Sequence, residues 1–138
     1  MSQTSVVFPN PACFHEENGT VRLIAGECPS CGRRFFPKED WCPNCLSTEL
    51  KARLLSPVGT VYTYTVVHQK SGMGIPSPYV LAFVDFPEDV RVLMQLETNP
   101  QDVRIGMEVS VVLGKIGVDD QGNDLISYKG RPAGRRDV

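Results

Sequence analysis

The sequence predicts a mainly β protein, in which a short N-terminal helix and a rubredoxin-like zinc ribbon precede a five-stranded OB-fold barrel. Two Cys-x-x-Cys pairs that lie close together in the first half of the chain predict the ribbon. In the second half, runs of β-branched and aromatic residues alternate with clusters of Gly, Pro, Asn and Asp, which predicts strands joined by turns. We therefore expect the helix and ribbon in residues 1–56, and the barrel with a C-terminal tail in residues 57–138.

The N-terminal segment predicts an extended stretch followed by one or two helical turns. Asn10 suits the N-cap, Pro11 suits the first helical position, and Gly19 is expected to end a helix over residues 12–18. The first residues have neither the basic start nor the apolar stretch of a secretory signal. We therefore expect a cytoplasmic protein.

Four cysteines predict a metal site. Cys28 and Cys31 form one pair, Cys42 and Cys45 form the other, and ten residues separate the pairs. Two facing knuckles place four thiolates in a tetrahedral cage, which suits zinc or iron. Because protein fills all four positions, the metal is expected to stabilise the fold and not to catalyse. The short gap favours structural Zn²⁺, whereas electron transfer through rubredoxin-like iron would give a coloured protein, and disulfides would need an oxidising compartment.

Eight short strands are expected after the N-terminal segment. The ribbon strands are residues 21–25, 33–37 and 49–55, and a turn signal at residues 56–59 marks the boundary. The barrel strands are residues 60–69, 79–86, 90–98, 109–116 and 125–128. Five short strands predict a small barrel, and the OB-fold is the commonest five-stranded version.

Composition excludes some classes of protein. The hydrophobic fraction of 41% and charged fraction of 22% are ordinary for a soluble protein, and no apolar run is long enough to span a membrane. The formal net charge is −2, and a zinc ion bound by four thiolates adds a further −2, giving −4. Such a charge is poorly suited to non-specific binding of a phosphate backbone.

This order of elements resembles the family of zinc-ribbon plus OB-fold proteins associated with acyl-CoA metabolism. The stretches that carry the resemblance are the two cysteine knuckles and residues 59–67, 76–79 and 105–109. The chain departs from the family pattern at Leu46, where a second Gly often follows the last cysteine. It also departs at Phe14 and His15, where a Phe-Trp pair is common.

The resemblance implies a small accessory subunit of a thiolase-superfamily enzyme. Such a subunit docks on the catalytic subunit and helps to form or gate its acyl-CoA site, without performing the chemistry itself. The sequence is consistent with this role, because no motif places a nucleophile, a base and an orienting group together. The alternative is a nucleic-acid-binding or protein-interaction module, although few cations accompany the aromatic residues of the barrel strands.

Eight residues are candidates for contact with coenzyme A or with the catalytic partner. Cations on the ribbon suit phosphate groups, and the glycines of the loop at residues 70–79 allow close approach of the backbone to a ligand. Trp41 either stacks on an adenine or a partner surface, or covers the zinc cage and packs the ribbon onto the barrel. The eight candidates are Arg33, Arg34, Lys38, Trp41, Lys70, Gly72, Gly74 and Tyr79.

A few other residues suggest functions, each with a simpler structural interpretation. Cys13 is a conceivable acyl-carrying thiol, but a spare cysteine is more often a small apolar residue. His68 is a conceivable general base, but a histidine at a strand end is more often solvated. Basic residues of the C-terminal tail offer further phosphate contacts, or form a solvated tail; they are Lys129, Arg131, Arg135 and Arg136.

Overall fold

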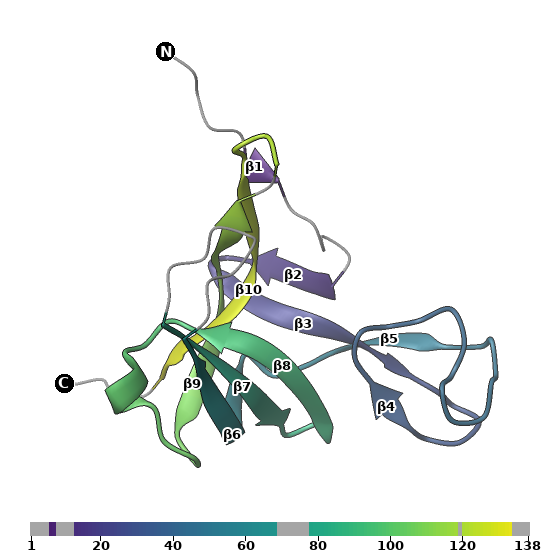
Figure 1. Ribbon diagram of the computed structural model, residues 1–138. Helices are drawn as coiled ribbons and strands as arrows, with labels where there is room; N and C mark the ends of the chain where they lie inside the picture. Colours follow the sequence, from purple (N-terminus) through teal and green to yellow (C-terminus); the bar gives the residue numbers. More distant parts are fainter. Residues whose placement is uncertain (1–5, 8–12, 69–77, 119, 134–138) are drawn as a thin grey trace.

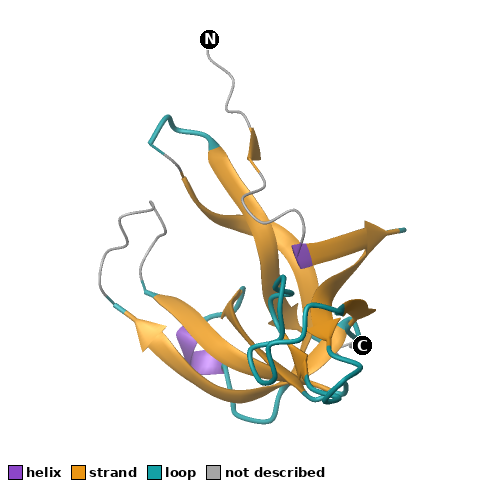
Figure 2. Cartoon of the chain, turned by 90° about the vertical axis from the view of Figure 1, so that its right-hand side faces the viewer, coloured by secondary structure: helices purple, strands orange, loops and turns teal. Residues whose placement is uncertain are grey.

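A computed structural model describes residues 6–7, 13–68, 78–118 and 120–133 of the chain. Most of these residues are in strands (Figure 2). The strands of the first half are β1 (Val6–Val7), β2 (Phe14–Glu17), β3 (Thr20–Glu27), β4 (Arg34–Phe35) and β5 (Lys51–Leu54). The second half contains β6 (Val58–Val67), β7 (Tyr79–Phe86), β8 (Val90–Leu96), β9 (Glu108–Val118) and β10 (Asp124–Pro132), with a 3-10 helix, η2 (Pro100–Asp102), between β8 and β9.

The strands β6 to β10 close into the predicted OB-fold barrel. Neighbouring strands follow the order β10-β8-β7-β6-β9, and β9 pairs with β10 to complete the circle. All of these pairings are antiparallel except the short parallel contact between β10 and β8 at Gly130 and Leu96. Buried and more exposed residues alternate along β7 and β8, as expected for strands with one face on a core. The β9–β10 hairpin extends beyond the barrel toward β1 (Figure 1).

The ribbon is built around β3. The first half of β3 pairs with β2, and its second half pairs with β4 and β5. The strands predicted at residues 21–25, 33–37 and 49–55 are thus confirmed as β3, β4 and β5. Figure 1 shows β4, β5 and the loops between them lying to one side of the barrel.

The predicted N-terminal helix is wrong for residues 14–17, which form strand β2. The cause is the turn that follows. Asn18 and Gly19 have φ angles of 53° and 82°, and they join β2 to β3 as a two-residue hairpin. Asn-Gly is a strong hairpin signal, and treating Gly19 only as a helix terminator overlooked it. Residues 10–12, the predicted start of the helix, lie outside the described residues.

One hydrophobic core extends from the ribbon into the barrel. Leu23 on β3 and Leu55 after β5 are fully buried, and they belong to the same cluster as the inward-facing residues of β6 to β9. The barrel members include Val61, Val80 and Val84, which are also fully buried. The boundary at residue 56 stays a prediction, but residues on its two sides share this core.

Polar contacts hold the ribbon against the turn between β7 and β8. The backbone N–H and the hydroxyl of Ser56 donate to the Glu88 carboxylate at 3.1 and 2.8 Å. The Arg34 guanidinium donates to the Glu88 carbonyl oxygen at 3.0 Å and to the Glu27 carboxylate at 3.1 Å. Burial raises the pKa of Glu88, but the two Ser56 donors outweigh it, so the net pKa is below its ordinary value.

Replacing Glu88 with glutamine is expected to lower the free energy of unfolding by about 1 kcal/mol at neutral pH, because a neutral amide accepts the Ser56 bonds more weakly. Since the folded pKa is depressed, the carboxylate stabilises the fold above the unfolded pKa of about 4.5 and loses this effect as pH falls through the folded value. The free energies of unfolding of wild type and Glu88→Gln, measured by urea titration, should therefore converge at low pH. Asp89→Asn is the control, because exposed Asp89 lies beside Glu88 and Asn tolerates its φ of 69°. If wild type and Glu88→Gln still differed by the same free energy of unfolding at low pH, the stabilising role of the Glu88 carboxylate would be contradicted.

Candidate metal centre

The four predicted ligands come together in one cluster. The Sγ atoms of Cys28, Cys31, Cys42 and Cys45 all lie within 4.8 Å of one another. The Sγ atoms of Cys28 and Cys45 are 3.5 Å apart, and those of Cys31 and Cys42 are 3.7 Å apart. A tetrahedral zinc ion with Zn–S bonds of about 2.3 Å separates its sulfurs by about 3.8 Å. The donor set and its spacing therefore fit Zn²⁺.

Two knuckles of the same design position these sulfurs. In the first, the Gly32 N–H donates to the Cys28 carbonyl at 2.7 Å; in the second, the Leu46 N–H donates to the Cys42 carbonyl at 2.9 Å. The amide groups of Cys28 and Cys42 donate in turn to the carbonyls of Arg33 and Ser47. Further N–H groups point at the sulfurs, such as that of Asn44 at 3.3 Å from the Cys42 Sγ. Local backbone bonds thus shape each Cys-x-x-Cys turn.

The surroundings of the four cysteines favour the thiolate form, but the four thiols cannot all lose their protons unless a cation lies among them. The Arg33 N–H and the Asn44 side chain lower the pKa of the Cys31 thiol to about 6. At Cys45 the Ser47 N–H also lowers the pKa, but the neighbouring Cys28 thiol and burial outweigh it and raise the pKa to about 12. Negative charges this close oppose one another unless a metal ion lies between them. Because four protein ligands fill a tetrahedral shell, zinc here would stabilise the fold.

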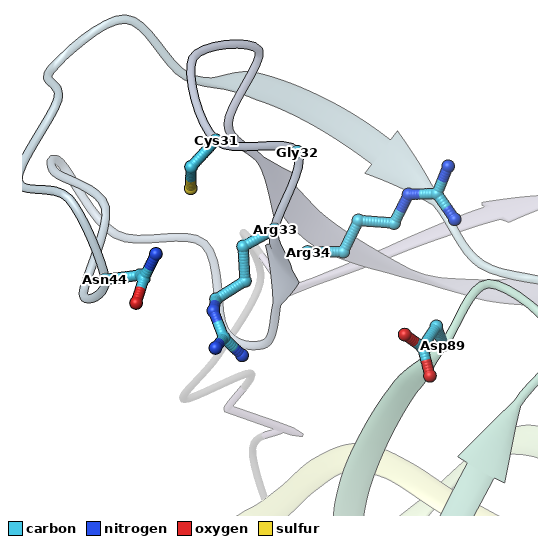
Figure 3. Close-up of a pocket in the computed structure, with 6 residues that line it drawn as sticks. All are labelled: Cys31, Gly32, Arg33, Arg34, Asn44 and Asp89. Atoms are coloured by element: carbon cyan, nitrogen blue, oxygen red, sulfur yellow. The ribbon is translucent and has the colours of Figure 1, made fainter.

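The ribbon cations differ in what they contact. Arg34 is engaged by Glu27 and the Glu88 carbonyl, so it fixes the ribbon in place. Arg33 and Lys38 are exposed, and within the described residues neither side chain has a hydrogen bond or ion pair. Arg33 lines a cleft of about 320 Å³ beside the cage, together with Asn44 and Asp89. Figure 3 shows Asn44 and the Arg33 guanidinium on the same side of the cleft, with the guanidinium pointing away from Cys31, and Arg34 extending to the opposite side.

The other candidate residues are dispersed. Trp41 is 49% exposed, which leaves about half of its side chain accessible to a ligand or a partner. Tyr79 begins β7, half-buried and paired with Val67. Lys70, Gly72 and Gly74 lie outside the described residues.

Cys13 and His68 are consistent with their simpler interpretations, but the solvated tail expected at Lys129 and Arg131 is wrong, because both residues lie on β10. Cys13 is half-buried, and burial raises the pKa of its thiol, which opposes a nucleophilic role. His68 is exposed at the end of β6. Lys129 and Arg131 both pair with Glu97, at 3.4 and 2.9 Å, so these two cations link β10 to the end of β8. Arg135 and Arg136 lie outside the described residues.

Sequence reasoning missed an exposed apolar face on the barrel. Tyr62, Phe83 and Leu93 lie on the adjacent strands β6, β7 and β8, and each is more than 40% exposed. The Arg91 guanidinium lies 3.5 Å from the centroid of the Tyr62 ring and pairs with Asp85 at 2.6 Å. The alternation along β7 and β8 could have revealed these outward-facing positions.

Two protein-family models match this chain, one over the ribbon and one over the barrel. The family model described as the ChsH2 rubredoxin-like zinc ribbon domain matches residues 21–51. The model described as the ChsH2 C-terminal OB-fold domain matches residues 52–114. The zinc-ribbon match and the cysteine cluster together support structural Zn²⁺.

Two relatives match most of the chain. A DUF35 domain-containing scaffold protein of Methanocaldococcus jannaschii is 39% identical over 114 residues, covering 80% of this chain and 81% of the relative. Benzoylsuccinyl-CoA thiolase subunit BbsA of Geobacter metallireducens is 35% identical over 114 residues, covering 83% of this chain and 77% of that subunit.

A solved structure is also similar. The Ltp2-ChsH2(DUF35) aldolase superposes with a TM-score of 0.66 at 29% sequence identity, over 82% of this chain and 86% of that chain.

Proposed function

The chain belongs to the DUF35 family of ChsH2-type zinc-ribbon and OB-fold proteins, and on this premise we propose that it is a non-catalytic accessory subunit of a thiolase-type acyl-CoA enzyme. The observation that carries the proposal is the match to a benzoylsuccinyl-CoA thiolase subunit, which extends over most of both chains. A relative that shares both the ribbon and the barrel is a reasonable guide to a shared docking role.

The build of the molecule supports a docking role. The cage offers four cysteine ligands, which fill a tetrahedral shell and leave no open position for substrate chemistry. The shared core and the Glu88 contacts hold the ribbon firmly against the barrel. Two surfaces presented at a fixed angle suit a protein that connects or completes other subunits.

The finer part of the proposal is that this chain helps to form or gate the acyl-CoA site at the interface with its partner. Arg33 and Lys38 are the ribbon cations left available for coenzyme A phosphates, since Arg34 is already engaged. The loop at residues 70–79 is the proposed element at the mouth of the partner's site. We place the whole assembly in the cytoplasm, where thiols stay reduced and available to zinc. No described helix is both long and apolar enough to cross a bilayer.

The proposal predicts that a thiolase-type subunit accompanies this chain in its own cells. The test is purification of the tagged protein at low salt with nuclease present, followed by mass spectrometry of the proteins that elute with it. We expect a thiolase-type subunit near a one-to-one ratio. The finer part predicts that this complex retains a coenzyme A thioester in gel filtration, whereas the isolated chain does not. Recovery of no such subunit would overturn the proposal, and a complex that does not retain the thioester would overturn only the finer part.

One observation favours the alternative of a nucleic-acid-binding module. Tyr62 and Phe83 lie exposed on the first two barrel strands, and aromatic residues on this part of an OB-fold can stack on bases. However, the nearby Arg91 is paired with Asp85, and the chain carries a net charge of −2. Co-elution of nucleic acid without nuclease treatment, and of no thiolase-type subunit with it, would favour this alternative.

A further inference from the structure

The two knuckles of the ribbon differ at one backbone position. The residue after each second cysteine adopts a left-handed conformation, with a φ of 78° at Gly32 and 66° at Leu46. Both residues donate the same hydrogen bond to the first cysteine of their pair. Glycine adopts this conformation freely, whereas a residue with a Cβ is disfavoured there. The first knuckle therefore shows which residue the turn prefers, and the second departs from it.

Folding of this chain does not account for Leu46. Its side chain is 67% exposed, so it buries little apolar surface to offset the unfavourable backbone. A strained residue that persists without a packing reason suggests a function.

Trp41 is a second exposed apolar residue on the same knuckle. It is 49% exposed and precedes Cys42, whose carbonyl accepts the Leu46 N–H. Trp41 and Leu46 therefore flank one turn, and we call this pair the ribbon tip. Tryptophan is the residue type most enriched among those that dominate binding energy at protein interfaces.

The surroundings of the ribbon tip are acidic. Glu39, Asp40 and Glu49 are exposed, and Lys38 is the cation of this segment. Together with Arg33 beside the cage and the charge of a zinc ion held by four thiolates, these groups sum to about −3. This charge disfavours nucleic acid and anionic lipid as partners of the ribbon tip. It also disfavours a second copy of the chain joined tip to tip.

We propose that the ribbon tip inserts into an apolar pocket with a basic rim on the thiolase-type catalytic subunit. This inference rests on the proposed function and assigns the docking contact to Trp41 and Leu46. Trp41 then contacts protein and not an adenine ring. The pocket holds Leu46 and Trp41, and its rim complements the acidic residues around them.

The test compares binding of tagged variants to the thiolase-type subunit recovered with the wild-type protein. Leu46→Gly should weaken the dissociation constant by about tenfold or more while the zinc content is retained and the thermal midpoint is equal or higher. Ile105→Ala is the matched control, because Ile105 is also 67% exposed but lies on the barrel side of the chain. It should change binding by less than about twofold. Phe83→Ser tests the exposed barrel face as the alternative docking surface.

A second measurement does not depend on a variant. Trp41 is the sole tryptophan, so fluorotryptophan incorporated into this chain gives one fluorine resonance. Adding the unlabelled catalytic subunit should shift and broaden that resonance.

The proposal is overturned if Leu46→Gly binds within about twofold of wild type, or if the fluorine resonance stays unchanged when the complex forms. If purification of the wild-type protein yields no thiolase-type subunit, the proposed function is wrong. The docking partner proposed for the ribbon tip is then wrong as well. That outcome is distinct from a complex that forms without the ribbon tip.

Discussion

Replacement of Cys42 with serine is expected to abolish zinc binding and unfold the ribbon. A serine hydroxyl stays protonated near neutral pH and is a poor zinc ligand, so the cage loses one of its four donors. The apparent binding free energy of structural zinc in small ribbons is about 10–16 kcal/mol, and it is present only in the folded form. Since a domain is stable by about 5–15 kcal/mol in total, loss of the metal should unfold at least β4, β5 and the knuckles.

Cys13→Ser is the matched control for this experiment. Cys13 is the one cysteine outside the cluster, and it lies half-buried near the start of β2. Elemental analysis should find one zinc per chain in wild type and in Cys13→Ser, and none in Cys42→Ser. Hydrogen exchange should show lost protection in the ribbon of Cys42→Ser. A Cys42→Ser protein that keeps its zinc and its ribbon protection would disprove the structural role of the metal.

The cysteine spacing and the strand patterns predicted most of the architecture. Two Cys-x-x-Cys pairs separated by a short gap are typical of a site with four cysteine ligands, so the sequence alone predicted the four ligands. Runs of β-branched and aromatic residues between turn clusters predicted β7 and β8 well, and each of these strands has one buried face.

The N-terminal prediction failed because two local signals competed. Pro11 and Gly19 fit the ends of a helix, but Asn18 with Gly19 also fits a two-residue hairpin turn. Pairing of β2 with β3 decided between them, and that partner is not apparent in a short segment.

The features that distinguish the candidate site depend on tertiary contacts. Arg34 looked like a free cation in the sequence, but Glu27 and Glu88 engage it in the fold. The exposure of Leu46 likewise follows from how the second knuckle faces solvent, although the absence of glycine at that position was visible in the sequence.

Replacement of Leu55 with alanine is expected to lower the free energy of unfolding by about 2–5 kcal/mol, the usual cost of a cavity at a fully buried leucine. Leu55 is 0% exposed, and its N–H donates to the Leu23 carbonyl at 2.9 Å. Leu54 is the matched control, because it precedes Leu55 in the chain but is 38% exposed. Leu54→Ala should cost less than about 0.5 kcal/mol.

The same pair of variants tests whether the ribbon and the barrel unfold together. Trp41 fluorescence reports on the ribbon, and far-ultraviolet circular dichroism is dominated by the larger set of barrel strands. Because Leu23 and Leu55 lie in one core with Val61 and Val84, both probes should show a single urea transition, and Leu55→Ala should shift both midpoints equally. If residues 1–56 and 57–138 were independent, Leu55→Ala would shift the transition of one probe and leave the other in place. A shared transition would mean that zinc binding at the ribbon also stabilises the barrel, since whatever binds only the folded form stabilises the whole cooperative unit.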